Sequence, residues 1–232
     1  EGVPVWQLFT STPGLDRVPL YATINRALRS RTAEDYDALV GEAVAQGFAT
    51  VKCAPFEAVD SAEDALEKSR PGLDLLKRLR DAWPELAVRV DFHERFVPSD
   101  FFALLPELEA LRLDWIEEPF EMGPAYRELQ RRTDLRIAAG ELHWGSRRFR
   151  EIIDNGLAHV IMPDVKHVGG FGPLLDVLAI SAGRVEVSPH NPSGPISTAA
   201  SLHAAAVRSA PVRSIEYAFD RARSRRSTES ST

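Results

Sequence analysis

Short apolar runs alternate with amphipathic segments along the chain from about residue 20 to residue 220. A short apolar run between turn residues is typical of a buried strand, whereas apolar residues at three- and four-residue spacing are typical of a helix. The alternation predicts a parallel sheet covered by helices. Strands are expected at Leu20–Ile24, Thr50–Ala54, Ala87–Phe92, Trp115–Glu117, Arg136–Ala139, His159–Met162, Val185–Ser188 and Ser214–Tyr217.

Helices are expected between these strands. Thr32 is a good N-cap, because acidic residues follow it and apolar residues then recur at helical spacing as far as Gly47. Pro71 is predicted to open a second helix, and Ser99 to cap a third. Further helices are expected over Pro124–Arg132, Ser146–Asn155, Phe171–Gly183 and Pro195–Ser209.

Eight strand–helix repeats in about 200 residues reach the lower size limit of a TIM-type (β/α)8 barrel, an α/β fold. An open doubly wound sheet is the competing architecture. The barrel would occupy residues 18–220. Residues 1–17, which are rich in turn residues, are expected to be an N-terminal remnant or linker, and residues 221–232 a disordered tail.

Charge and cysteine content exclude several classes of protein. The 232 residues include 28 Lys and Arg against 34 Asp and Glu, a net charge of −6, which argues against nucleic acid or an anionic membrane as a partner. Cys53 is the only cysteine, so no disulfide can form within the chain, and a cytoplasmic location is expected. We find neither a membrane-spanning apolar stretch nor the pattern of a signal peptide.

Ionisable residues stand at or just after the ends of the apolar runs of six predicted strands, at intervals of 23 to 26 residues. In a parallel barrel the carboxyl ends of the strands open into one mouth, so these side chains are expected to converge. They are Asp91, Glu117, Glu141, Asp164, His190 and Glu216.

Converging carboxylates repel one another unless a cation or a proton joins them. The third to fifth predicted strands supply Asp91, Glu117 and Glu141, whose hard oxygen donors favour Mg²⁺. Zinc is less favoured, because the sequence shows neither a set of thiolates nor a matched histidine cluster.

Asp164 and His190 follow the next two strands. A carboxylate beside an imidazole orients the ring and raises its basicity, which makes His190 a candidate general base. Lys52 ends the second strand, where it could be a second acid/base group or a cationic clamp on an anionic substrate.

These motifs resemble the barrel domain of the mandelate racemase and muconate lactonizing enzyme group of the enolase superfamily, which includes acid-sugar dehydratases. The matching segments occur in family order. They are Val90-Asp91, Trp115-Ile116-Glu117-Glu118-Pro119, Gly140-Glu141, Met162-Pro163-Asp164 with Val168-Gly169-Gly170, and Ser188-Pro189-His190.

The resemblance implies a role for each residue of the series. The implied Mg²⁺ ligands are Asp91, Glu117 and Glu141, the implied acid/base dyad is Asp164 with His190, and Glu216 would bond beside the substrate carboxylate. The shared family chemistry is removal of the proton α to a carboxylate, with the metal ion stabilising the enediolate.

The sequence departs from the family pattern at two places near the site. The family's second strand commonly reads Lys-x-Lys, but Lys52-Cys53-Ala54 keeps only the first lysine, which favours chemistry with one base, on the His190 side. His93 stands where many relatives have Asn, and is a candidate for contacting metal-bound water or substrate. Lys166 and His167, just beyond Asp164, are further substrate-binding candidates.

The family's N-terminal α+β capping domain is largely absent from this chain. The expected function is that of a Mg²⁺-dependent hydro-lyase, an acid-sugar dehydratase that removes the α-proton and eliminates a β-hydroxyl. A racemase or epimerase, a cycloisomerase, and a truncated barrel without activity are the alternatives. A small carboxylate is the expected substrate and a homo-oligomer the expected assembly.

Overall fold

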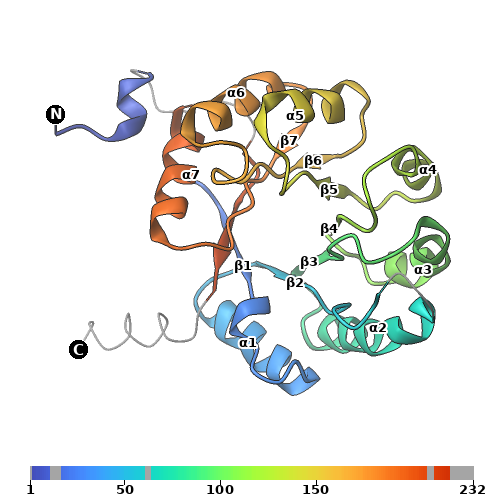
Figure 1. The fold of residues 1–232 in the computed structure, drawn as a ribbon. Helices are drawn as coiled ribbons and strands as arrows, with labels where there is room; N and C mark the ends of the chain where they lie inside the picture. Colours follow the sequence, from blue (N-terminus) through green and yellow to red (C-terminus); the bar gives the residue numbers. More distant parts are fainter. Residues whose placement is uncertain (1, 11–16, 61–63, 208–211, 220–232) are drawn as a thin grey trace, which may run out of the picture. The chain divides into compact units, whose positions relative to one another are not determined.

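The computed structural model describes residues 2–10, 17–60, 64–207 and 212–219 (Figure 1). Within these residues, eight strands alternate with seven α-helices. The strands are β1 (Leu20–Thr23), β2 (Thr50–Cys53), β3 (Ala87–Asp91), β4 (Trp115–Glu117), β5 (Ile137–Ala139), β6 (Val160–Ile161), β7 (Glu186–Val187) and β8 (Ile215–Ala218). The helices are α1 (Ala33–Ala45), α2 (Ala65–Ala82), α3 (Pro98–Ala110), α4 (Ala125–Arg132), α5 (Gly145–Asp154), α6 (Phe171–Ser181) and α7 (Pro195–Val207), with short 3-10 helices η1 (Val5–Leu8) and η2 (Asn25–Ala27).

This order of elements confirms the predicted (β/α)8 class. The predicted tail at 221–232 and the last two residues of the predicted helix Pro195–Ser209 lie outside the described residues. Of the predicted N-terminal remnant, residues 2–10 and 17 are described, and the ring of Phe9 contacts the ring of Phe171 at 5.4 Å. No α-helix among the described residues is long and apolar enough to cross a membrane.

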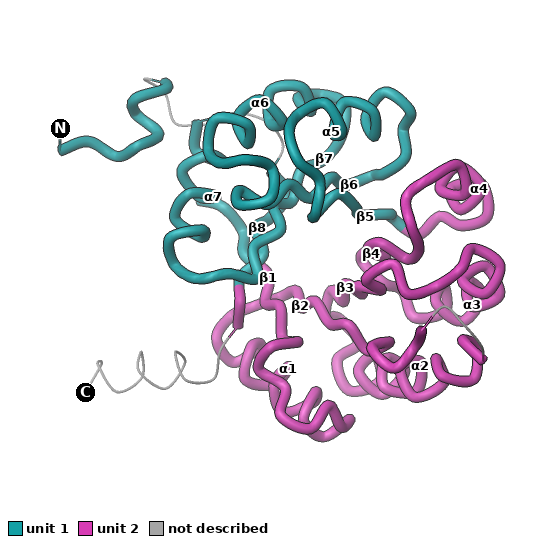
Figure 2. Tube along the Cα trace, viewed as in Figure 1, with its two compact units in different colours: residues 1–20, 136–217 teal, residues 21–135, 218–232 magenta. Residues whose placement is uncertain are grey.

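Figure 2 divides the chain into two compact units. The β1–β4 unit comprises residues 21–135 and 218–232, and the β5–β8 unit comprises residues 1–20 and 136–217. In the first unit, each strand pairs in parallel with the next, ending with Asp91 opposite Glu117. In the second, β5 pairs with β6 and β6 with β7, also in parallel. A doubly wound sheet reverses its strand order at a switch point, and neither unit contains such a reversal among its described strands.

Helix α1 begins as the sequence predicts. The Thr32 hydroxyl accepts a hydrogen bond from the backbone N–H of Asp35 at 3.3 Å, which satisfies one donor of the first turn. Tyr36, Leu39 and Val40 are buried along its inner face. The capping signal and the apolar spacing therefore agree with the structure at this helix.

Two helix starts are corrected by the structure. Helix α2 begins at Ala65, so Pro71 lies inside the helix rather than at its start. A proline there removes one backbone donor, and in the preceding turn the Ser69 hydroxyl donates to the Leu66 carbonyl at 2.7 Å. Helix α3 begins at Pro98, and Ser99 makes no capping bond to the backbone, because its hydroxyl contacts the Asp100 carboxylate at 3.3 Å.

Buried aromatic rings fix the loops that follow the strands of the β1–β4 unit. Phe56 and Phe92 stack with ring centroids 4.8 Å apart, and Phe101 meets Phe92 edge-on at 5.0 Å. All three side chains are almost completely buried. Because Phe92 directly follows Asp91, this packing holds the carboxyl end of β3 in place.

Candidate active site

Two carboxylates lie together at the carboxyl ends of neighbouring strands. Asp91 is the last residue of β3 and Glu117 the last of β4, and the two are register partners in the parallel pairing. Asp91 is 2% exposed and Glu117 is fully buried. Two buried anions at this spacing require a positive partner.

Lys52 on β2 supplies positive charge to the carboxylates of both Asp91 and Glu117. Its ammonium nitrogen lies 2.6 Å from Oε1 of Glu117 and 3.2 Å from Oδ2 of Asp91, and the lysine itself is 1% exposed. Burial raises the pKa of the Asp91 carboxyl, but the Lys52 charge and the hydrogen bonds from His93 outweigh it and hold the pKa below its usual range. Asp91 is therefore ionised.

The second oxygen of Glu117 is held by Trp115. The indole N–H donates to Oε2 of Glu117 at 3.1 Å, two residues along the same face of β4. The guanidinium of Arg89 lies 3.7 Å from the centroid of the Trp115 ring and 4.2 Å from that of Tyr21, and it pairs with Asp114 at 2.8 Å. Glu117 is thus fixed at both oxygens by buried side chains.

His93 extends the same cluster toward solvent. Its two ring nitrogens lie 3.1 Å from Oδ2 of Asp91 and 3.3 Å from Oε1 of Glu57, and its side chain is 35% exposed. The backbone at His93 has φ of +47°, a conformation that is costly for a residue with a side chain. The structure therefore places the His93 ring in contact with Asp91, a predicted metal ligand, and leaves the ring partly exposed to solvent.

The positions after Lys52 offer no second base. Cys53 is fully buried, and burial, with a further contribution from Asp91, raises the pKa of its thiol to about 12. Ala54 is buried and its backbone N–H donates to Asn25 Oδ1 at 2.7 Å. Neither side chain can take a proton near neutral pH.

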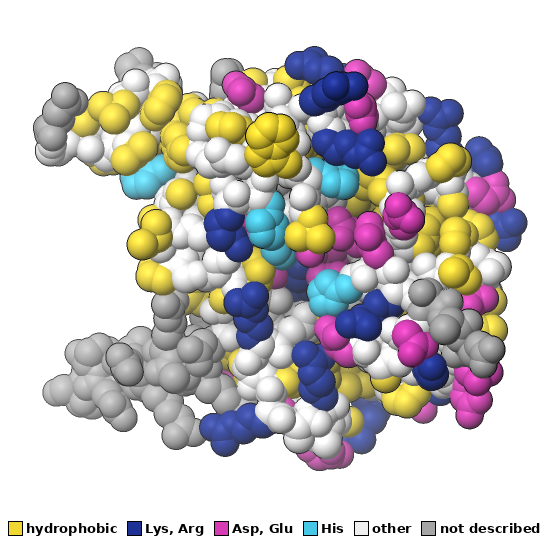
Figure 3. Space-filling model, viewed as in Figure 1, with side chains coloured by type: hydrophobic (Ala, Val, Ile, Leu, Met, Phe, Trp, Pro, Cys, Tyr) yellow, Lys and Arg dark blue, Asp and Glu magenta, His cyan; other side chains and the backbone are white. Residues whose placement is uncertain are grey.

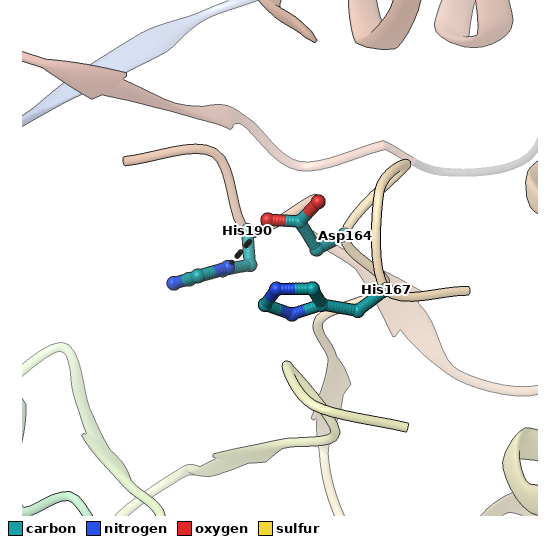
Figure 4. Close-up of side chains that lie close together, drawn as sticks. All are labelled: Asp164, His167 and His190. Carbon is teal, nitrogen blue, oxygen red and sulfur yellow. Dashed lines mark hydrogen bonds and ion pairs between the residues drawn. The ribbon is translucent and has the colours of Figure 1, made fainter. Parts of the chain in front are cut away.

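The β5–β8 unit contains a histidine surrounded by carboxylates. His190 Nδ1 lies 2.9 Å from Oδ2 of Asp164 (Figure 4). Its Nε2 lies 3.0 Å from Oε2 of Glu141 and 3.7 Å from Oε2 of Glu216. His190 is 7% exposed, so these contacts are made largely out of water.

Asp164 is held by contacts at both of its oxygens. It is fully buried, its Oδ1 accepts the backbone N–H of Lys166 at 2.7 Å, and the Lys166 ammonium lies 3.2 Å from Oδ2. Burial raises the pKa of Asp164. The hydrogen bonds from His190 and Lys166 lower the pKa by more than burial raises it, so the net shift is downward. The ionised carboxylate therefore fixes the His190 ring.

Glu216 and Glu141 are positioned by the backbone around them. The backbone N–H of Asn191 donates to Oε2 of Glu216 at 3.0 Å. Gly140, before Glu141, has φ of +109°, and a Cβ there would lie 2.8 Å from the Phe149 ring. Glycine is required at this position for both reasons, and it sets the direction of the chain into Glu141.

His167 lies on the loop between β6 and α6, with its ring centroid 6.2 Å from that of His190 (Figure 4). Its Nδ1 contacts the backbone carbonyl oxygen of Glu141 at 3.0 Å. The sequence predicts His167 as a substrate-binding residue, and the structure brings it beside the dyad.

Residues 35–229 match the family described as enolase C-terminal domain-like. The chain belongs to this family. It is 37% identical over 117 residues to a D-galactonate dehydratase from Verminephrobacter eiseniae, covering 49% of this chain and 31% of that protein. It is 28% identical over 207 residues to a D-galactonate dehydratase from Klebsiella pneumoniae, covering 86% of this chain and 52% of that protein.

A solved enolase from Agrobacterium radiobacter, a candidate galactarate dehydratase with bound Na and L-malate, superposes with a TM-score of 0.78. The two chains are 27% identical, and the match covers 94% of this chain and 55% of that one. The chain spans about a third to a half of the length of the curated relatives it matches. The resemblance to the enolase superfamily predicted from the motifs is confirmed.

The residues of the β1–β4 unit suit the divalent metal ion of the enolase superfamily. Asp91 and Glu117 already direct carboxylate oxygens at a single cationic group, the Lys52 ammonium. Their donor atoms are hard oxygens, and both carboxylates are held by other side chains. The third predicted ligand, Glu141, belongs to the β5–β8 unit, where its carboxylate contacts His190.

Sequence reasoning missed three residues that position the site. They are Trp115, which the sequence places in a strand and in the matching Trp115–Pro119 segment without a role of its own, and Arg89 and Asn191. A tryptophan two residues before Glu117 lies on the same face of the strand, and that spacing was the available signal. The signal for Arg89 is weaker. It is a charged residue within an apolar run, and a buried charge needs a partner of opposite charge.

Proposed function

We propose that the protein is a Mg²⁺-dependent acid-sugar dehydratase. The observation that carries this proposal is the contact of His190 with the buried Asp164 carboxylate at 2.9 Å, with its other ring nitrogen facing Glu141 and Glu216. An imidazole fixed in this way is suited to take a proton and later return it. The D-galactonate dehydratases that the chain resembles support the choice of substrate class.

The side chains of the site would have separate roles in metal binding and proton transfer. Asp91, Glu117 and Glu141 would hold the metal ion, whose charge stabilises the enediolate when it is bound. Asp164 accepts the Nδ1–H of His190, so the lone pair lies on Nε2 and takes the α-proton of the substrate. The imidazolium then protonates the β-hydroxyl, which leaves as water, and the resulting enol tautomerises to a 2-keto acid.

Four further residues would bind the substrate. Glu216, oriented by the backbone of Asn191, would bond beside the substrate carboxylate. Lys166, 44% exposed at the side chain, would offer positive charge to it, and His93 and His167 would contact its hydroxyls. Lys52 would stabilise the negative charge of the site rather than act as a base, because it is paired with two carboxylates.

A racemase or epimerase is the nearest alternative, since it uses the same enediolate. A two-base mechanism needs an acid/base group on the second face of the substrate. Cys53 and Ala54 do not supply one, which favours elimination with a single base. A cycloisomerase and a barrel without turnover are distinguished from a dehydratase by the products of the assay below.

The drawn face of the molecule carries charged side chains of both signs (Figure 3). Figure 3 shows Lys and Arg side chains interspersed with Asp and Glu side chains over the drawn face. A small carboxylate as substrate, a cytoplasmic location and a homo-oligomeric assembly remain predictions, as does the absence of nucleic acid and membrane partners.

The test is incubation of the protein with Mg²⁺ and a panel of aldonic and aldaric acids, with detection of 2-keto acids as semicarbazones. We expect a 2-keto acid from one or a few members of the panel, and none when a chelator is added. If the products are epimerised acids and no 2-keto acid forms, the protein is an epimerase rather than a dehydratase. No product from any member would support the barrel without turnover.

His190→Asn tests the base. We expect exchange of the substrate's α-proton in D₂O to fall by about 10²–10⁴-fold, which is the usual contribution of a general base. His203→Asn, the same change in α7 of the same unit, is the control and should exchange like the unaltered protein. If His190→Asn exchanges as fast as the control, the base is another residue, with Lys166 and Lys52 as the next candidates.

A further inference from the structure

A second set of possible metal ligands lies in the β5–β8 unit, and it differs chemically from the acidic set. Asp164, His167 and His190 each offer one donor atom, and these atoms all lie within 4.8 Å of one another (Figure 4). Asp164 and His190 are buried, and His167 is half-buried on the loop before α6. The set contains two imidazoles and one carboxylate.

A hydrogen bond already orients one member of this set, His167. The Glu141 carbonyl oxygen can only accept, so the nitrogen of His167 that contacts it at 3.0 Å must carry the hydrogen. The lone pair of His167 is then on Nε2. A histidine that donates one ring N–H to a carbonyl and presents the other nitrogen is typical of metal ligands in proteins.

The position of Asp164 favours a cation. Its carboxylate is fully buried and ionised, and it contacts His190 and Lys166, two groups that carry or can carry positive charge. Metal–ligand bonds of about 2.0–2.2 Å place the ligands of one tetrahedral ion within about 3.5 Å of each other. Binding would therefore bring the three donor atoms, which lie within 4.8 Å of one another, closer together.

We propose that Asp164, His167 and His190 form a binding site for a first-row transition metal ion such as Zn²⁺. Imidazole nitrogens select such ions, whereas Mg²⁺ prefers all-oxygen sets such as Asp91 and Glu117. The protein would therefore bind two classes of cation at different side chains.

Occupation of this site has a functional consequence, which rests on the proposed dehydratase function. If His190 bound the ion through Nε2, that nitrogen would have no lone pair left to accept the α-proton. Transition metal ions would therefore inhibit the reaction that Mg²⁺ supports.

The experiment is titration with Co²⁺, which reports tetrahedral nitrogen and oxygen coordination through intense visible absorption, in the presence of excess Mg²⁺ and without substrate. We expect one Co²⁺ per chain, displaced by Zn²⁺. His167→Gln should weaken Co²⁺ binding by about 10-fold or more, because loss of a ligand exceeds the effect of losing its outer hydrogen bond. The matched control, His203→Gln in α7, should bind like the unaltered protein.

Equal Co²⁺ affinity in His167→Gln and the control would overturn the proposal, as would the absence of tetrahedral absorption in the unaltered protein. Asp164→Asn is a second test, because it preserves shape and removes the ligand charge, and it should also weaken binding. Thermal unfolding of each variant verifies that the fold is retained. Since no substrate is present, failure of this test leaves the dehydratase proposal standing, and failure of the substrate panel leaves this one standing.

Discussion

The two units place different basic side chains against their buried acids. In the β1–β4 unit, Asp91 and Glu117 contact the ammonium of Lys52 at 3.2 Å and 2.6 Å. In the β5–β8 unit, the carboxylates contact His190, and an imidazole is the type of side chain that can both take and return a proton. The comparison teaches that a lysine suits a fixed electrostatic role, whereas a histidine suits proton transfer.

The largest effect on stability is expected from Lys52→Met. The change leaves two buried carboxylates without their ammonium, and breaking a buried ion pair in this way typically costs about 3–5 kcal/mol. We expect a loss of this size in the free energy of unfolding, measured with urea in the presence of a chelator. Added Mg²⁺ should recover part of the loss, because the carboxylates then gain another cation.

Lys68→Met is the matched control for this experiment. Lys68 contacts Asp60 at 2.7 Å, close to the Lys52–Glu117 distance, but its side chain is 38% exposed and that of Asp60 is 68% exposed. Such a pair contributes about 0–1 kcal/mol. Equal losses for the two variants would mean that burial does not distinguish the two ion pairs.

An intermediate effect is expected from Trp115→Phe. The change removes the indole N–H that holds Oε2 of Glu117, and a hydrogen bond to a charged group contributes about 1.5–3 kcal/mol. Urea unfolding of this variant, of Glu117→Gln and of the double variant measures their coupling. Additive losses would show that Trp115 supports the fold without holding Glu117.

The smallest effect concerns a second histidine of the β5–β8 unit. His159 Nδ1 accepts the backbone N–H of Ile137 at 3.0 Å, so this nitrogen is unprotonated in the fold. Partial burial of the ring, and secondarily Arg136, lower the pKa of His159. The unfolded chain therefore binds the proton first as the pH falls below about 6.5, and the free energy of unfolding decreases.

His159→Asn should flatten that dependence between pH 7 and pH 5, because an amide oxygen can accept the same N–H without titrating. Urea unfolding at several pH values measures it. An unchanged pH dependence would show that the His159 ring is not a source of acid sensitivity in this unit.

The fold class and the positions of the acids could be predicted because both follow from periodicity. Asp91 and Glu117 end strands whose apolar residues are buried, and the parallel register then brings them opposite each other. Pro71 was misplaced because a proline is acceptable in a first turn by local rules alone, whereas packing of α2 extends the helix before it. Local propensity cannot reveal packing that residues distant in the sequence provide.

Contacts between side chains were harder to predict than their placement. The sequence locates Lys52 at a strand end, but its choice between a base and a counter-ion depends on distances to Asp91 and Glu117. The contact of His167 with the Glu141 carbonyl depends likewise on how the β6–α6 loop folds. Both depend on tertiary structure, which a linear pattern does not encode.

Cys53 provides a built-in reporter of opening of the β1–β4 unit. It is the only thiol of the chain, it is fully buried on β2, and its pKa of about 12 keeps it protonated. Thiol reagents react with the thiolate, so labelling must await exposure of this strand to solvent. The rate of modification therefore records how often the strand that carries Lys52 becomes accessible, with no engineered probe.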